Sequence, residues 1–203
     1  MGGRKYQIHG NIIRPSEENA EPGHGYMGIA YWVDVTEYDD IRIKYEDSRP
    51  VIATIVIDNY DELVKNHPDR IKNDLRDAVE DAISQWCDGK DGFLRRYDRD
   101  RYVFIFEEHW LPAMKAEKFT LLEQVHSVVS PSGIHATISI GVGHDGSGFE
   151  EDFQFSSLAT EMALSRGGDQ AVVKNRFNFE FFGGRGSEVE TRTKAVSYTH
   201  LRA

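Results

Sequence analysis

The chain has 203 residues, of which 39% are hydrophobic, and a formal net charge of −10 at pH 7. This acidic balance argues against nucleic acid or an anionic membrane surface as a partner, because both require clustered positive charge to displace counterions. No apolar run approaches the roughly 20 residues that span a bilayer, so we expect a soluble fragment. Its single cysteine, Cys87, has no partner for an internal disulfide and follows a helical apolar pattern, which predicts a buried thiol.

The N-terminal part predicts a β-hairpin followed by a helix. Two strand-like segments, 6–14 and 26–33, flank a polar loop that is rich in proline and glycine. Thr36 suits the N-cap of a charged helix at 37–48, which ends before Pro50. The hairpin has no core of its own, so we interpret this helix as a connector between domains.

From residue 51 on, strand and helix patterns follow in the order β-α-α-β-β-α-β-α-β. The segments are 51–57, 60–65, 68–87, 93–97, 102–106, 112–125, 136–143, 156–165 and 170–174. The clearest is the second helix, where apolar residues recur at spacings of three and four up to a stop at Asp88 and Gly89. Its stripe is Ile71, Leu75, Val79, Ile83 and Trp86. The order predicts an α+β fold, an antiparallel sheet of the palm type with helices packed on one face.

The hairpin at 93–106 has an unusual turn. Four charged residues, Asp98, Arg99, Asp100 and Arg101, join its two strands. A turn without glycine or asparagine must use conformations that ordinary L-residues tolerate, and its side chains fill space where a glycine turn admits a phosphate group. The pattern argues against close approach of a nucleoside triphosphate to this backbone.

Three stretches resemble a known family. The segments 55–63 (IVIDNYDEL), 138–143 (ISIGVG) and 166–174 (RGGDQAVVK) are similar to the GGDEF domain of diguanylate cyclases, in the degenerate form of GdpP/YybT-type cyclic-di-AMP phosphodiesterases. The N-terminal hairpin, ending in WVDVTE at 32–37, similarly resembles the last strands of a PAS domain that lead into a signalling helix.

The resemblance implies a division of the chain into five parts. These are a C-terminal PAS remnant at 1–36, a linker helix at 37–48, a degenerate GGDEF domain at 49–178, a linker towards a missing DHH domain at 179–194, and a non-native tail at 195–203 that resembles sequencing-adapter read-through.

The resemblance also shows what the site has lost. A diguanylate cyclase holds two divalent cations with acids at the end of the first strand and in the hairpin turn. The first-strand acid falls on Val56, and the five signature positions fall on Asp98, Arg99, Asp100, Arg101 and Tyr102. Both glycines are replaced, and Arg101 stands where an acid is expected.

Two acids remain, Asp58 and Asp100, and they would give at most a single weak Mg²⁺ site, which folding does not require. Each also has a simpler interpretation. Asp58 suits a cap of the short helix that begins near Tyr60. Asp100 suits an exposed turn residue that is paired with a neighbouring arginine.

Base recognition is altered as well. The asparagine that recognises guanine in the family falls on Val64, and only Asn66, Asn73 or Asp74 would substitute for it after a shift. Turn and exposed-helix roles are the alternatives for these three residues. The inhibitory Arg-x-x-Asp motif of active cyclases falls on Gly89 and Gly92.

We therefore expect a regulatory module of a cyclic-di-AMP phosphodiesterase whose hydrolysis is carried by a downstream DHH domain, at the cytoplasmic face of the membrane. ATP or GTP are the candidate ligands, with slow ATP hydrolysis at most, and the PAS and linker-helix part is a candidate homodimer contact. Two alternatives stay open. One is an active diguanylate cyclase that makes cyclic-di-GMP from GTP, and the other is a non-catalytic dimerisation or signal-relay domain without nucleotide affinity.

Overall fold

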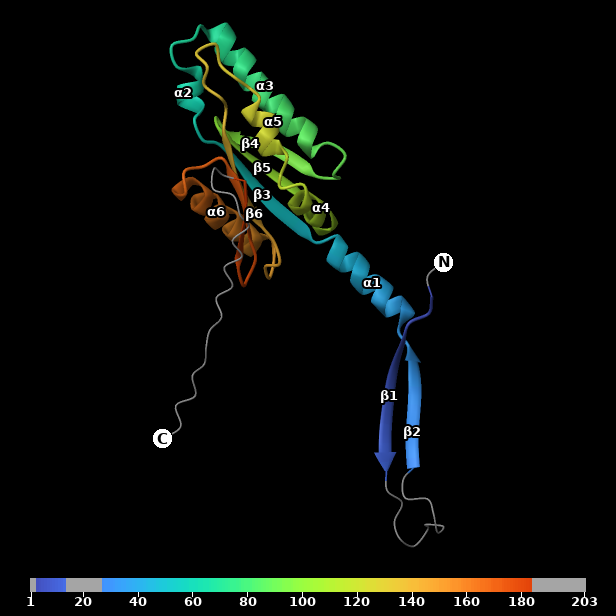
Figure 1. Ribbon diagram of the computed structural model, residues 1–203. Helices are drawn as coiled ribbons and strands as arrows, with labels where there is room; N and C mark the ends of the chain where they lie inside the picture. Colours follow the sequence, from blue (N-terminus) through green and yellow to red (C-terminus); the bar gives the residue numbers. More distant parts are fainter. Residues whose placement is uncertain (1–2, 14–26, 184–203) are drawn as a thin grey trace, which may run out of the picture. The chain divides into compact units, whose positions relative to one another are not determined.

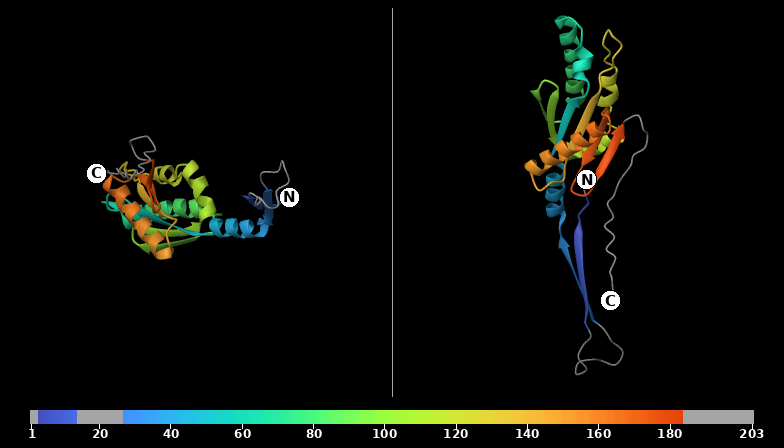
Figure 2. Two further views of the ribbon diagram at one scale, coloured as in Figure 1. Left: turned by 90° about the horizontal axis from the view of Figure 1, so that it is seen from below. Right: turned by 90° about the vertical axis from the view of Figure 1, so that its left-hand side faces the viewer.

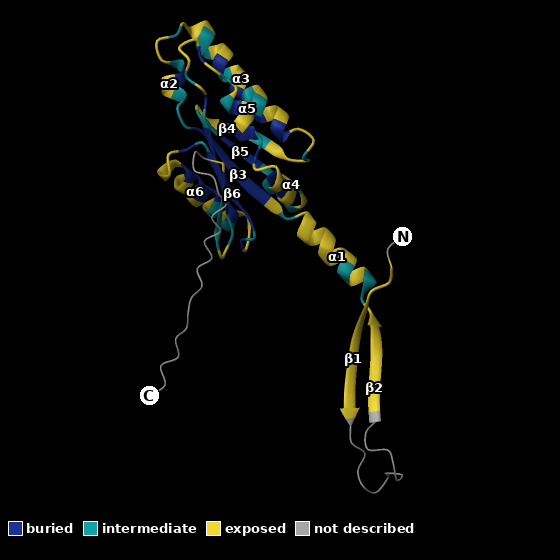
Figure 3. Cartoon of the chain, in the orientation of Figure 1, coloured by how far each residue is buried: buried dark blue, intermediate teal, exposed yellow. Residues whose placement is uncertain are grey.

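The computed structural model describes residues 3–13 and 27–183, and the chain divides into two compact units, Met1–Asp47 and Ser48–Ala203 (Figure 1). In the first unit, strands β1 (Tyr6–Ile13) and β2 (Met27–Asp34) pair antiparallel, and helix α1 (Thr36–Asp47) follows. The predicted hairpin and helix are thus confirmed. No residue of α1 is buried, and both strands are exposed (Figure 3).

The start of α1 differs from the prediction. Thr36 is already the first helical residue, and its backbone N–H donates to Asp34 Oδ1 at 3.0 Å. The Thr36 hydroxyl accepts a hydrogen bond from the backbone N–H of Lys5 at 2.8 Å. Asp34 therefore satisfies a free N–H of the first turn in place of Thr36, and the hydrogen bonds from Thr36 lower the pKa of the Asp34 carboxyl.

The second unit is built on a six-stranded sheet with the order β4-β5-β3-β6-β7-β8. Its strands are β3 (Pro50–Ile57), β4 (Phe93–Asp98), β5 (Arg101–Glu107), β6 (Ile138–Gly143), β7 (Gln170–Lys174) and β8 (Phe179–Gly183). All neighbours pair antiparallel except β6 and β7, which run parallel. The prediction of an antiparallel sheet is wrong for this pair. The long helix α6 (Phe149–Ser165) connects the two strands and returns the chain to the end of the sheet where β6 began, so that β7 runs in the same direction.

Helices cover both faces of this sheet, which corrects the prediction of one covered face. They are α2 (Tyr60–Val64), α3 (Asp69–Cys87), α4 (Leu111–Ala116), α5 (Leu121–His126) and α6 (Phe149–Ser165), with a 3₁₀ turn, η2 (Glu108–Trp110). Ala53 and Ile55 of β3 belong to the main core with residues of α3, α4 and α5. Thr54, between them, bonds to Ser156 of α6 on the other face, where α6 crosses the sheet (Figure 2).

The helix α3 confirms its predicted stripe. Leu75, Val79, Ile83 and Trp86 are buried. Asp88 caps the end through its backbone N–H, which donates to the Ser84 carbonyl at 3.0 Å. The following glycine, Gly89, has a φ of 71°, the left-handed conformation that commonly ends a helix.

The helix predicted at 112–125 is two helices, α4 and α5. Lys118 and Phe119 separate them, with φ values of 52° and 55°. Phe119 is fully buried and its ring packs against Trp86 and Phe182. Burial of an aromatic ring contributes about 2 kcal/mol or more, which offsets the cost of a left-handed residue.

Two further element boundaries differ from the predicted ones. Helix α6 begins at Phe149, seven residues before the predicted start at 156, and its first turn carries Glu150, Glu151 and Asp152, which a helix N-terminus favours. Strand β8 pairs with β7 along its length. The linker predicted from residue 179 therefore begins no earlier than the end of β8, and its remainder, like the predicted tail, lies outside the described residues.

No helix in the ranges 3–13 and 27–183 has both the length and the hydropathy that a membrane crossing needs.

We expect Cys87 to be unreactive in the folded chain, because burial raises the pKa of its thiol to about 12 and the thiolate is the nucleophile. At pH 8 an aromatic disulfide reagent should react at least about 100-fold more slowly than after unfolding. The matched control is the double variant Cys87→Ala, Ser84→Cys, whose thiol lies on the exposed side of the same helix. Equal rates for the two chains would contradict the burial of Cys87.

Candidate functional site

The structure brings the signature turn and the end of β3 together. In the register of β3 and β5, Val56 lies directly opposite Arg101, and the backbone N–H of Ile57 donates to the Asp100 carbonyl at 2.9 Å. Val56 is 3% exposed. The two positions at which the resemblance places metal-binding acids are therefore cross-strand neighbours, and they hold a buried valine and an arginine.

The turn itself is closed by an arginine. Arg99 and Asp100 form a two-residue connection, and neither has a positive φ, as the sequence predicted for a turn without glycine. The Arg96 guanidinium donates to the carbonyls of Asp98 at 3.0 Å and Arg99 at 2.8 Å. The backbone N–H of Arg99 is bound to Asp98 Oδ1 at 2.7 Å. That donor is thus not free for a phosphate group, which backbone N–H groups would otherwise cradle.

Arginine side chains also connect the hairpin to the helices. Arg99 Nη2 lies 2.8 Å from Asp61 Oδ1, and its guanidinium lies over the Tyr60 ring at 5.0 Å. Arg96 Nη1 lies 3.5 Å from Glu80 Oε2 on α3. Exposed pairs of this kind contribute roughly 0.5 kcal/mol each. Arg99 thus pairs with Asp61, and the pairing of Asp100 with a neighbouring arginine stays a prediction.

Asp58 holds the turn between α6 and β7. Its Oδ2 accepts the backbone N–H of Asp169 at 2.9 Å, while Oδ1 is buried without a hydrogen-bond partner. Burial raises the pKa of Asp58, and the Asp169 hydrogen bond acts in the opposite direction. A Cβ at Gly168, whose φ is 74°, would lie 2.6 Å from Asp58 Oδ2. Only glycine fits beside this carboxylate.

The interpretation of Asp58 as a helix cap is therefore wrong. Helix α2 has Asn59 at its N-cap, without a side-chain cap hydrogen bond. The Asn59 amide instead donates to the His135 carbonyl at 2.8 Å and accepts from the Thr137 N–H at 3.1 Å. Both side chains after β3 thus face distant loops.

These residues do not fit a two-metal centre. Val56 and Arg101 offer no carboxylate, and one oxygen of Asp58 is already bound to the Asp169 N–H. Within the described part of the chain, no three or more His, Cys, Asp or Glu side chains are grouped so that they could hold a metal ion. Divalent cations of the Mg²⁺ type require several oxygen ligands.

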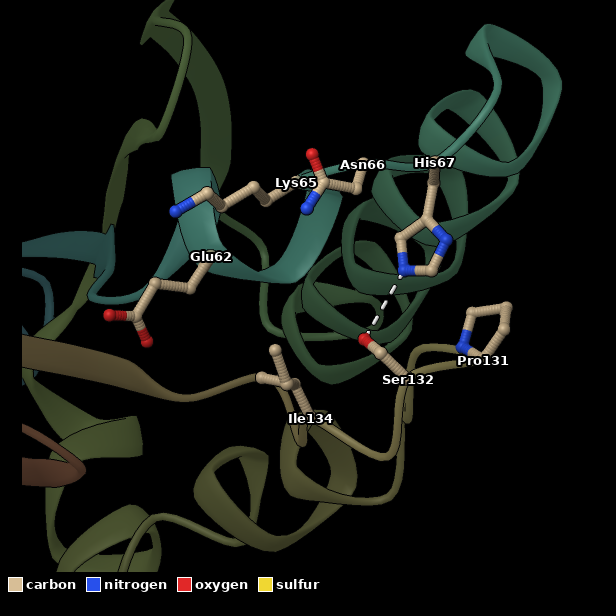
Figure 4. A pocket seen from close by; sticks show the side chains of 7 residues that line it. All are labelled: Glu62, Lys65, Asn66, His67, Pro131, Ser132 and Ile134. Carbon is tan, nitrogen blue, oxygen red and sulfur yellow. Dashed lines mark hydrogen bonds between the residues drawn. The ribbon is translucent and has the colours of Figure 1, made fainter.

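A pocket of about 610 Å³ opens next to this region, beyond α2 (Figure 4). Its lining residues come from α2, the α2–α3 connection and a later loop: Glu62, Lys65, Asn66, His67, Pro131, Ser132 and Ile134. His67 and Ser132 point toward each other, with Nε2 and Oγ 3.3 Å apart. The volume falls within the range of small-molecule sites.

Only one of the three predicted base-recognition residues lines this pocket. Asn66 lies at its rim with a φ of 62°, a conformation that asparagine tolerates better than most residues. Asn73 and Asp74 lie on the exposed side of α3 and do not line it. Sequence reasoning missed Lys65, His67 and Ser132, because they sit in turns that carry no periodic pattern.

The model of the family described as "Cyclic-di-AMP phosphodiesterase GdpP-like, GGDEF domain" matches residues 55–181. The chain is 32% identical over 172 residues to the cyclic-di-AMP phosphodiesterase GdpP of Geobacillus thermodenitrificans, covering 84% of this chain and 26% of that protein. It is also 32% identical over 167 residues to the cyclic-di-AMP phosphodiesterase PdeA of Listeria monocytogenes, covering 82% and 25%. The chain thus spans about a quarter of the length of these relatives.

Solved structures share the fold. The active GGEEF domain of a diguanylate cyclase from Vibrio cholerae aligns with a TM-score of 0.54 at 13% identity, over 67% of this chain and 89% of that one. The GGDEF domain of DgcB from Caulobacter crescentus in complex with c-di-GMP aligns with a TM-score of 0.53 at 16% identity, over 68% and 85%. At these identities the likeness establishes a GGDEF-type α+β fold, as the sequence predicted.

We expect Asp58 to make stability depend on pH. Its folded pKa is raised by burial, so its contribution is fully present below the unfolded pKa and is lost as pH rises through the folded pKa. The wild type should therefore lose stability relative to Asp58→Asn as the pH rises from 4 to 7. The difference between their free energies of unfolding is measured by urea denaturation. Asp74→Asn, an exposed acid on α3, is the control. A constant difference between wild type and Asp58→Asn over this range would rule the burial effect out.

Proposed function

Because the chain belongs to the GGDEF domain family of GdpP-like cyclic-di-AMP phosphodiesterases, we propose that it is a regulatory module of such an enzyme and does not polymerise nucleotides itself. The pairing of Val56 with Arg101 carries this proposal. A two-metal centre needs negative charge where the cations bind. Here one acid is replaced by an apolar side chain and the other by a permanent positive charge.

The signature turn supports the same conclusion. Its carbonyls accept from Arg96, and Arg99 extends to Asp61 of α2. A triphosphate in this position would have to displace both arginine contacts. The alternative of an active diguanylate cyclase requires this displacement as well as a metal centre, so we place it second.

We propose further that the pocket beside α2 binds a nucleotide, ATP or GTP, with at most slow ATP hydrolysis. Lys65, Asn66, His67 and Ser132 provide hydrogen-bond donors around a volume of about 610 Å³. One Mg²⁺ ion, held weakly by Asp58 and Asp100, is the most that the remaining acids would support. A signal-relay domain without nucleotide affinity is the competing proposal.

For the whole protein, we propose that cyclic-di-AMP hydrolysis lies in a downstream DHH domain at the cytoplasmic face of the membrane. The relatives named as cyclic-di-AMP phosphodiesterases are about four times as long as the matched region. The exposed surface of the first unit supports a homodimer contact through the PAS remnant and linker helix, because Ile8, Ile12 and Trp32 are 62%, 79% and 62% exposed. A two-stranded hairpin with such a surface is marginal without a partner.

We expect no cyclic-di-GMP from GTP and Mg²⁺. Without acids at positions 56 and 101, the two cations that activate the attacking hydroxyl and neutralise the phosphates have no complete site. Product is measured by chromatography, with the Vibrio cholerae GGEEF domain as positive control in the same buffer. Turnover within tenfold of that domain would contradict the regulatory proposal.

Nucleotide binding at the pocket is expected to depend on Asn66. Asn66→Gly removes the amide and keeps the left-handed backbone, so affinity for ATP or GTP should fall about tenfold, or roughly 1.4 kcal/mol. Asn73→Ala, on the exposed side of α3, should leave affinity unchanged in calorimetric titrations. No heat of binding for the wild type would favour the relay domain. Unchanged affinity in Asn66→Gly would place the nucleotide outside the pocket.

The Mg²⁺ part of the proposal has its own test. Titrations with and without Mg²⁺ are repeated on the double variant Asp58→Ala, Asp100→Ala. The proposal predicts that any Mg²⁺-dependent gain in affinity disappears in this variant. A gain that survives the loss of both aspartates would overturn the metal site.

A further inference from the structure

Helix α6 is tied to β3 at three points along its length, and the first is an ion pair at the start of the strand. Arg49 Nη1 donates to Asp145 Oδ1 at 3.1 Å, and Nη2 donates to the Gly146 carbonyl at 3.0 Å. The Gly146 N–H in turn donates at 2.7 Å to Asp152 Oδ1, in the first turn of α6. Asp152 is 2% exposed. This short relay fixes the beginning of α6 to the residue that precedes β3.

The second point is a buried hydrogen-bond chain in the middle. Thr54 Oγ1 and Ser156 Oγ lie 2.7 Å apart, and the Ser156 hydroxyl donates to the Gly141 carbonyl of β6 at 2.9 Å. A Cβ at Gly141 or Gly143 would overlap the backbone of α6. At these two glycines the helix therefore lies directly against the backbone of the sheet, and such close packing leaves little freedom to tilt.

The third point is at the far end of β3. There Asp58 accepts the Asp169 N–H, in the turn that follows α6. Residues 49, 54 and 58 thus hold the start, middle and end of one 17-residue helix, which is about 25 Å long at 1.5 Å per residue. Its last contact lies at the same end of β3 as Val56 and the signature turn.

We propose that Arg49 is a latch through which β3 and α6 move as one body, so that opening the contact at the start of β3 also loosens the Asp58–Asp169 contact at its other end. Arg49 is the second residue after α1 in the chain, so the latch lies where the chain enters the second unit. This inference rests on the proposed regulatory role for its biological meaning, and it supplies the route that such a role needs. The coupling itself is a property of the second unit alone.

The test is amide hydrogen exchange followed by NMR on the full chain without nucleotide. In Arg49→Gln, the Asp169 amide should exchange at least tenfold faster, although it lies at the opposite end of α6. In Asp58→Ala, the Gly146 amide should accelerate likewise, since coupling between two sites is reciprocal. Acceleration of only the nearer amide in each variant would overturn the latch.

Two controls separate local opening from global loss of stability. Arg176→Gln removes a looser ion pair to the same end of α6, with Arg176 Nη2 3.9 Å from Glu151 Oε2, and should leave both amides unchanged. The Phe119 amide, bound to the Met114 carbonyl at 3.0 Å on the other face of the sheet, reports global unfolding. If it accelerates equally, the Asp169 amide chemical shift decides. A shift in Arg49→Gln but not in Arg176→Gln supports the latch, and an unchanged shift overturns it.

These outcomes are independent of nucleotide binding and turnover. If the exchange experiment finds no coupling, the proposed regulatory function is unaffected and requires another route. A confirmed latch in a chain that forms cyclic-di-GMP would keep the coupling and remove the function that it was proposed to serve.

Discussion

Strand β3 is buried on both faces, and the rest of the second unit depends on this constraint. Its odd-numbered residues enter the main core with α3, α4 and α5, while Thr54 and Val56 face the side of α6. A strand in this position tolerates polar groups only where they find partners. Thr54 finds Ser156, and Asp58 finds the Asp169 N–H. Val56 meets the same requirement by having no polar group at all, at the position where the resemblance implies a metal-binding acid.

The same need for partners applies to the signature turn, which adjoins the neighbouring strand β5. A guanidinium at Arg101 beside two cations would repel them strongly in a partly buried site, and beside a buried valine it meets no such conflict. Arg96 and Arg99 satisfy the turn carbonyls and Asp61, respectively. In the proposed regulatory module, the loss of the metal acids and the gain of arginines are thus one consistent change, and the turn serves as a structural contact instead of a site for metal-bound phosphates.

Much of this could be predicted from the sequence where the signal was local. The stripe from Ile71 to Trp86 predicted α3, and the segment 170–174 predicted β7 at its observed bounds. The family likeness assigned the altered metal positions to Val56 and Arg101, and the structure shows that these two residues are cross-strand neighbours. Contacts between distant residues could not be predicted. The partner of Asp58 lies 111 residues away, and a helix cap was the best local interpretation. Likewise, the break between α4 and α5 depends on a buried Phe119 ring, which no helical periodicity reveals.

We propose that a domain with Val56 and Arg101 at these positions holds no two-metal centre. Electron paramagnetic resonance of Mn²⁺, titrated into the chain with and without GTP, tests it most directly, with the Vibrio cholerae GGEEF domain as reference. We expect uptake of at most one weakly held ion per chain, and no second ion when GTP is added. Two bound Mn²⁺ ions per chain in the presence of GTP would contradict it.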